Sequence, residues 1–82
     1  MPWFARFDEP IKIAGRAPLR TLAEARGYIL ELRKLDRERI EWRTVTGILS
    51  QAATHGEPYV SMARLAFSRA LNKSRLKDRH QA

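Results

Sequence analysis

Apolar side chains recur along this chain with two different periods, and the change of period separates strands from the helices that follow. Over residues 3–7 one face of an extended segment would carry Trp3, Ala5 and Phe7, and the other Phe4 and Arg6. Residues 11–13 alternate apolar and basic, the two-residue period of a half-buried strand. Gly15 favours a turn, and residues 19–20 then return as a third short extended piece. We therefore expect a small β-hairpin around Gly15.

The first helix has a clear amino-terminal signal in Thr21 and Glu24, which form a Thr-x-x-Glu capping box. In this motif the Thr21 hydroxyl accepts a hydrogen bond from the Glu24 amide, and the Glu24 carboxylate accepts one from the Thr21 amide. We expect this helix to run to about Lys34. Its apolar stripe follows the helical period and consists of Leu22, Ala25, Tyr28, Ile29, Leu32 and Leu35.

Two more helices are expected after it. Asp36 is the candidate N-cap of the second, over residues 37–54, and Gly56 ends it because glycine suits the left-handed position after a helix. Its stripe consists of Trp42, Val45, Ile48, Leu49, Ala52 and Ala53. The third helix begins near Pro58 or Ser61 and extends to about Asn72. Its stripe consists of Ala63, Ala66, Phe67, Ala70 and Leu71.

This ββααα order predicts an α+β fold, in which a small N-terminal β-hairpin packs on three helices. With 82 residues the chain can bury one modest core. We expect residues 1–73 to form a single compact domain and residues 74–82 to form a basic, flexible tail. The sequence has no cysteine, which excludes disulfides and thiolate-based sites.

The location of the protein is predicted from two absences in the sequence. The start of the chain lacks the basic segment and apolar run of a signal peptide. No segment approaches the roughly 20 apolar residues that a membrane helix needs. We therefore expect a soluble, cytoplasmic protein that does not bind a membrane.

Several short segments together resemble one bacterial family. They are Glu9-Pro10-Ile11-Lys12-Ile13, Thr21-Leu22, Glu41-Trp42-Arg43 and the Ala-Arg-x-Ala-Phe block that begins at Ala63. Over nearly its whole length the chain resembles small proteins of rhizobia and related alphaproteobacteria grouped as domain of unknown function 982, although Leu35-Asp36 stands where that family usually has Trp-Pro. The resemblance implies a bacterial source. It implies no activity and no active-site residue, because the family has none assigned.

Candidate catalytic groups are few. His55 is expected at a helix end and His80 in the tail, and neither has the three or four convergent ligands that a metal site requires. Asp8 and Glu9 are adjacent, but a strand end before a proline is expected to leave both solvated. The glycines form no phosphate-binding loop. We therefore expect no enzyme activity, no metal and no cofactor.

Positive charge is concentrated toward the carboxyl end of the chain. Of a formal net charge of +7, the residues from Arg64 onward contribute six basic groups against one acid, a net +5. The candidate phosphate-binding residues are Arg64, Arg69, Lys73, Arg75, Lys77 and Arg79. Nucleic-acid binding is therefore one functional hypothesis. It has a second support in the third helix, which follows the second after a glycine-containing turn and so resembles a helix-turn-helix.

Protein association is the other hypothesis, and it is the one we favour. Five apolar residues lie off the main stripes of their helices: Leu30, Ile40, Met62, Leu65 and Leu76. In so small a domain we expect them in the core, whereas an exposed cluster would mark an interface. Trp3 and Phe4, in the expected N-terminal edge strand, are likewise either buried in the core or exposed at an interface. We predict a non-catalytic interaction or regulatory module that binds another protein or itself, with Trp3, Phe4, Met62, Leu65 and Leu76 as interface candidates.

Overall fold

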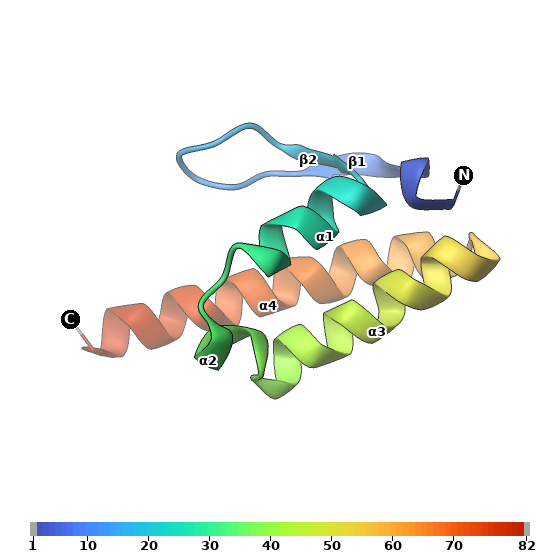
Figure 1. The fold of residues 1–82 in the computed structure, drawn as a ribbon. Helices are drawn as coiled ribbons and strands as arrows, with labels where there is room; N and C mark the ends of the chain where they lie inside the picture. The colour runs from blue at the N-terminus through green and yellow to red at the C-terminus, as the bar shows by residue number, and fades with distance from the viewer. Residues whose placement is uncertain (1, 82) are drawn as a thin grey trace.

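An antiparallel β-hairpin precedes the helices, which confirms the expected α+β order (Figure 1). The computed structural model describes residues 2–81, and it describes the side chains of residues 3–73. The elements in chain order are the 3-10 helix η1 (Pro2–Phe4), β1 (Arg6–Ile11), β2 (Leu19–Thr21), α1 (Leu22–Leu30), α2 (Lys34–Arg37), α3 (Ile40–His55) and α4 (Tyr59–Gln81). The hairpin and α1 lie over the same side of the layer formed by α3 and α4 (Figure 1).

The first strand is continuous where the sequence predicts two short strands. β1 runs through residues 8–10, including Pro10, instead of stopping there. Arg6 pairs with Thr21 and Ile11 pairs with Leu19, so the register shifts between the two pairs. Proline has no amide hydrogen to donate, and an irregularity of this kind is one of the few places where a sheet accommodates it.

Thr21 caps α1 as expected. Its hydroxyl oxygen accepts a hydrogen bond from the Glu24 amide at 3.2 Å. The Glu24 carboxylate accepts a hydrogen bond from the Arg20 amide at 2.7 Å, whereas the capping box predicts the Thr21 amide as its donor. The two bonds tie the end of β2 to the first turn of α1, so they fix the direction in which the helix leaves the hairpin.

The segment between the first two long helices differs from the prediction. α1 ends at Leu30 rather than near Lys34, and a separate short helix, α2, follows. Leu35 was expected in the apolar stripe of α1, but it is 78% exposed because the chain has already turned away from the core. Asp36 was expected to cap the next helix, but it lies inside α2.

The ends of the two longest helices follow local signals only in part. α3 begins after Arg39, with no side-chain cap, and ends before Gly56 as expected. The φ of Gly56 is positive, at 73°, which glycine accommodates, but its ψ of −141° differs from the left-handed helical conformation that was expected. At the start of α4 the Glu57 carboxylate accepts a hydrogen bond from the Ser61 amide at 3.0 Å. The backbone of α4 continues to Gln81 instead of ending near Asn72.

Three aromatic rings from three different helices form the centre of the core. The ring centroid of Trp42 lies 5.2 Å from that of Phe67, and Tyr28 lies 5.5 Å from Phe67 and 6.0 Å from Trp42. Trp42 and Phe67 are fully buried. Each ring belongs to a different helix, so their contact holds α1, α3 and α4 together.

Replacing Phe67 by alanine should lower the free energy of unfolding by about 3–5 kcal/mol, because it empties the centre of the aromatic cluster. Ile40→Ala is the control, since Ile40 is 70% exposed and its loss should cost less than about 1 kcal/mol. Urea denaturation of both variants measures the difference. Equal losses would show that the aromatic cluster is not the main source of stability.

Thr21→Ala should destabilise the protein by about 1 kcal/mol, because it removes the acceptor for the Glu24 amide. Thr54→Ala provides a matched comparison, since the Thr54 hydroxyl donates only to a carbonyl within its own helix. Thermal unfolding of both variants should show the larger loss for Thr21→Ala. The reverse order would contradict the capping role.

Candidate functional site

The structure offers no enclosed polar centre on which to build a catalytic site. Among residues 3–73 no polar or charged side chain is buried, and no group of three metal-ligating residues converges. His55 lies at the end of α3 as expected, with its ring 5.7 Å from that of Tyr59. Asp8 and Glu9 are exposed. Candidate sites are therefore to be found in surface hollows.

No helix within the described part of the chain combines the length and the apolar character needed to cross a bilayer.

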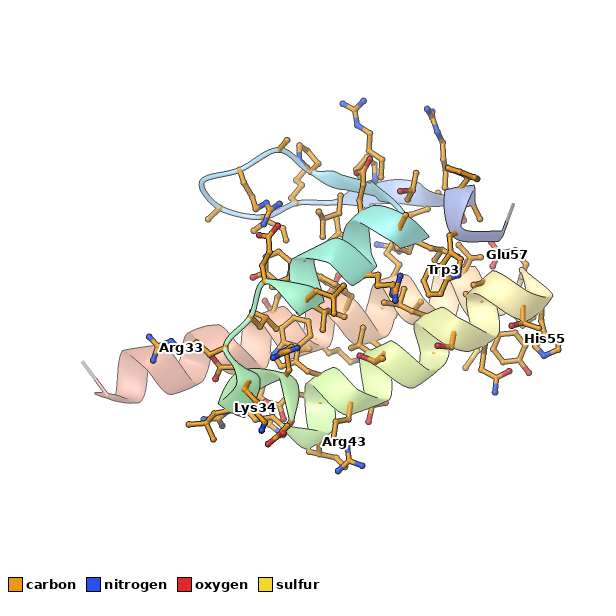
Figure 2. The ribbon with its side chains drawn as sticks, viewed as in Figure 1. Trp3, Arg33, Lys34, Arg43, His55 and Glu57 are labelled. Carbon is orange, nitrogen blue, oxygen red and sulfur yellow. The ribbon has the colours of Figure 1, made fainter. Side chains whose placement is uncertain are left out.

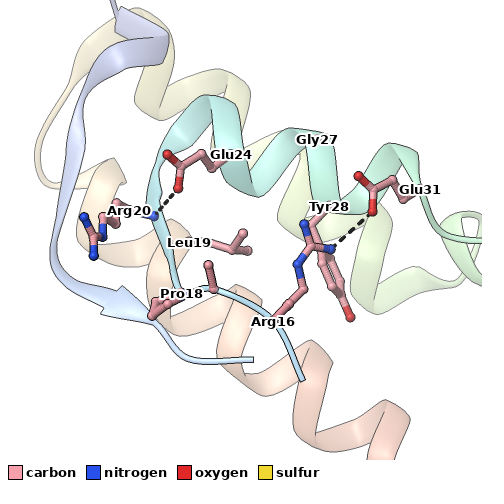
Figure 3. A pocket seen from close by; sticks show the side chains of 9 residues that line it. Arg16, Pro18, Leu19, Arg20, Glu24, Gly27, Tyr28 and Glu31 are labelled. Carbon is pink, nitrogen blue, oxygen red and sulfur yellow. Dashed lines mark hydrogen bonds and ion pairs between the residues drawn. The ribbon is translucent and has the colours of Figure 1, made fainter. Parts of the chain in front are cut away.

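One hollow, of about 580 Å³, lies between the hairpin loop and α1 (Figure 3). Arg16 donates a hydrogen bond to the Glu31 carboxylate at 3.2 Å, and its guanidinium lies 5.2 Å from the centre of the Tyr28 ring. The Glu24 carboxylate already accepts from the Arg20 amide. Two arginines and two glutamates line the hollow, so their formal charges balance. An ionic ligand would have to compete with these contacts, and we assign the hollow a structural role in holding the hairpin loop to α1.

A second hollow, of about 460 Å³, is a groove between α3 and α4, lined mainly by apolar surface. On α3 the residues Ile40, Thr44 and Ile48 are spaced four apart, which places them on one side of the helix. The residues that line this α3–α4 groove are Ile40, Glu41, Thr44, Ile48, Met62, Leu65, Ala66, Arg69, Ala70 and Lys73.

Large apolar side chains in the groove remain exposed to solvent. Ile40 is 70% exposed, Leu65 50% and Met62 45%. The expectation that these residues lie in the core is therefore wrong. It is also wrong for Leu30, which is exposed and lies outside the groove. The reason is the arrangement of layers. The hairpin and α1 cover one side of the α3–α4 pair (Figure 1), and every lining residue of the groove comes from α3 or α4.

Two of the predicted basic residues, Arg69 and Lys73, line the groove and are exposed. Within the described side chains neither has an acidic partner at ion-pair distance; the pairs found are Arg16–Glu31 and Arg39–Asp36. Glu41 is the acidic residue that lines the groove. The two cations therefore have their charges available to a ligand in the groove.

The other predicted basic residues do not join them on one face. Arg64 precedes Lys73 by about two and a half helical turns, so the two side chains lie on opposite sides of α4. Arg64 is also half-buried. The side chains of Arg75, Lys77 and Arg79 lie outside the described ones.

The structure brings together only part of the predicted interface. Met62 and Leu65 meet in the groove. Trp3 is half-buried and packs against the core, whereas Phe4 is 75% exposed in η1, away from the groove. The side chain of Leu76 lies outside the described ones.

Sequence reasoning missed the contribution of α3 to this surface. It assigned Ile48 to the core, against which Ile48 does pack, but it did not foresee that Ile48 also lines the groove with Thr44 and Glu41. The available signal was Ile40, which lies off the main stripe but two turns before Ile48 on the same side of the helix, so the apolar surface extends from the edge of the stripe toward Ile40. That spacing places the residues on one side of the helix, but it does not say whether another element covers them.

Further positive charge lies in the segment that leads into α3, at the same end of the helix pair as Lys73. Residues 33–43 contain five basic and three acidic residues. Figure 2 shows Arg33, Lys34 and Arg43 at the end of the molecule near α2, and His55 and Glu57 at the opposite end. The groove therefore runs from an apolar part near Met62 to a basic end near Lys73.

Comparison of the chain with protein-family models, with curated proteins and with solved structures finds no match. The resemblance to the alphaproteobacterial family stays a prediction from sequence motifs.

Leu65→Gln should reduce the free energy of unfolding by less than about 1 kcal/mol, because Leu65 is half exposed in an open groove. Leu49→Ala, at a fully buried position of α3, should cost about 2–5 kcal/mol. Urea denaturation compares the two variants. A loss for Leu65→Gln as large as that for Leu49→Ala would show that Leu65 is a core residue and that the groove is not a free surface.

Proposed function

We propose that this protein is a non-catalytic protein-interaction module that binds its partner in the α3–α4 groove. The main support is the exposure of three large apolar side chains, Ile40, Met62 and Leu65, in the lining of one groove. Single exposed apolar residues are ordinary on protein surfaces, but a contiguous group of them is characteristic of an interaction site.

The helices that form the groove are held in place by the core. On their other sides α3 and α4 bury large side chains, including Leu49 and Phe67, in the common core. The walls of the groove are therefore held in place before a partner arrives, and binding has to order little beyond surface side chains. A preformed surface of this kind suits recognition better than catalysis, because nothing in it is enclosed or buried and polar.

Nucleic-acid binding is the alternative function. Arg69 and Lys73 are compatible with it, because both present charges without an acidic partner among the described residues. The exposed apolar side chains of Ile40, Met62 and Leu65 in the same groove would, however, make no use of a phosphate backbone. α3 and α4 also lie side by side (Figure 1), unlike the strongly crossed pair of a helix-turn-helix. These features favour a protein partner.

A photo-crosslinking amino acid tests this function in cells that naturally produce the protein. Placed at Leu65, it should form a covalent adduct with another protein on irradiation, because that position lies inside the proposed contact. Placed at Ser50, on the exposed polar side of α3 outside the groove, it should form none. The adducts are measured by gel shift and mass spectrometry.

Two kinds of result would contradict the proposed function. Equal adducts at both positions, or none at either, would contradict an interaction module that uses the groove. An adduct at Leu65 that nuclease treatment removes would instead support the nucleic-acid alternative.

A further inference from the structure

We infer that the occupant of the α3–α4 groove is an acidic amphipathic helix supplied by another protein. This inference rests on the proposed function, and it adds the partner's secondary structure and charge.

The shape of the groove favours a helix. From Met62 to Lys73 it follows α4 for about 16 Å, and from Ile40 to Ile48 it follows α3 for about 12 Å, which is two to three helical turns. A helix laid between two helices places apolar anchors at positions i, i+3 or i+4, and i+7 along such a length. Those anchors would contact Ile48, Met62 and Leu65.

An extended peptide fits this surface less well than a helix. The backbone amides and carbonyls within α3 and α4 are already used in their own helical hydrogen bonds, so the groove offers side chains and no unpaired strand edge. A strand would leave its own backbone groups without protein partners against an apolar surface, and this is unfavourable. A helix satisfies its backbone hydrogen bonds internally and presents only side chains.

The charge of the groove favours an acidic helix. Arg69 and Lys73 on α4 face Glu41 as the acidic residue of the lining, which leaves one positive charge in excess. Apart from Glu41, which is already counted, residues 33–43 hold five basic and two acidic residues and so add three more positive charges than negative ones in the segment that leads into α3. The aliphatic stems of Arg69 and Lys73 can contact the occupant's apolar anchors while the charged heads reach its flanking carboxylates. Such complementarity also raises the association rate of an acidic partner.

A second copy of this chain is a poorer occupant. Each copy carries a formal net charge of +7. A symmetric dimer would bring the same surface of both copies together. Among the described lining residues, Arg69 and Lys73 of each copy would then be opposed by the two Glu41 side chains alone. Like charges in close contact disfavour that arrangement.

The test is a selection of displayed helical peptides, about 14 residues long to match the groove, against the purified protein. We expect the enriched peptides to share apolar residues at helical spacing and to carry a net negative charge. Chemical-shift changes on binding one of them should centre on Met62 and Leu65. The double variant R69E/K73E should bind that peptide about tenfold more weakly, and a version of the peptide with its acids changed to lysine should regain affinity for the variant.

The control variant is R6E/R20E, which makes the same change of net charge at two exposed positions of the hairpin outside the groove. It should bind the acidic peptide with nearly unchanged affinity. If R6E/R20E weakens binding as much as R69E/K73E does, only the overall charge matters and the inference is wrong. Circular dichroism of both variants establishes that each is folded.

Other outcomes separate this inference from the proposed function. A protein adduct at Leu65, combined with enriched peptides that are basic, uncharged or without helical spacing, would overturn the acidic helix and keep the interaction module. Sedimentation at twice the 9.5 kDa chain mass, lost on Leu65→Glu, would identify a second copy as the occupant and likewise overturn the inference. An absence of both adduct and enriched peptides would overturn both.

Discussion

The contact between Trp42 and Phe67 determines the geometry on which the rest of the structure depends. The two rings meet edge to face, at 82° and 5.2 Å between centroids, and both are sealed from solvent. Trp42 lies in the first turn of α3 and Phe67 well inside α4, so their contact fixes the relative position of the two helices along their length. Tyr28 then brings α1 onto the same side of the pair. The α3–α4 groove lies on the other side of the helix pair, and its position follows from the same buried contact. By aligning the two helices along their axes, this contact places Ile40 and Ile48 opposite the groove residues of α4.

The small size of the chain explains why the groove stays open. Once α3 and α4 are paired, only η1, the hairpin and α1 remain to cover them, apart from the four-residue α2. These elements lie over one side (Figure 1), where the capping bond at Thr21 and the contacts of Arg16 with Glu31 and Tyr28 hold them. A chain of 82 residues has surface enough for one core and no second covering layer. Among the described elements none is left to cover the groove side of the helix pair.

The parts of the fold that the sequence predicts are those decided by neighbouring residues. The Thr21 cap and the Gly56 helix end depend on chemistry within a few positions, and both are confirmed. The break after Leu30 was not predicted, because no glycine or proline marks it and the apolar period continues past it to Leu35. The candidate site could be predicted only in part. Periodicity shows that Met62 shares a side of its helix with other residues, but whether that side is covered depends on how distant segments pack, which a local pattern does not contain.

The exposure of the groove has a thermodynamic cost that clarifies its role. Full burial of one large apolar side chain stabilises a protein by about 1.5–3 kcal/mol, while a whole domain is stable by only about 5–15 kcal/mol. Full burial of Ile40, Met62 and Leu65 would therefore add substantially to the free energy of unfolding, and their partial exposure forgoes that gain. A partner helix would recover that burial on binding, and the apolar contact would supply most of the affinity. Apolar surface alone, however, would accept almost any amphipathic helix. In the proposed complex, Arg69 and Lys73 would provide the discrimination, because a basic helix would have to bring like charges against them while an acidic one would not.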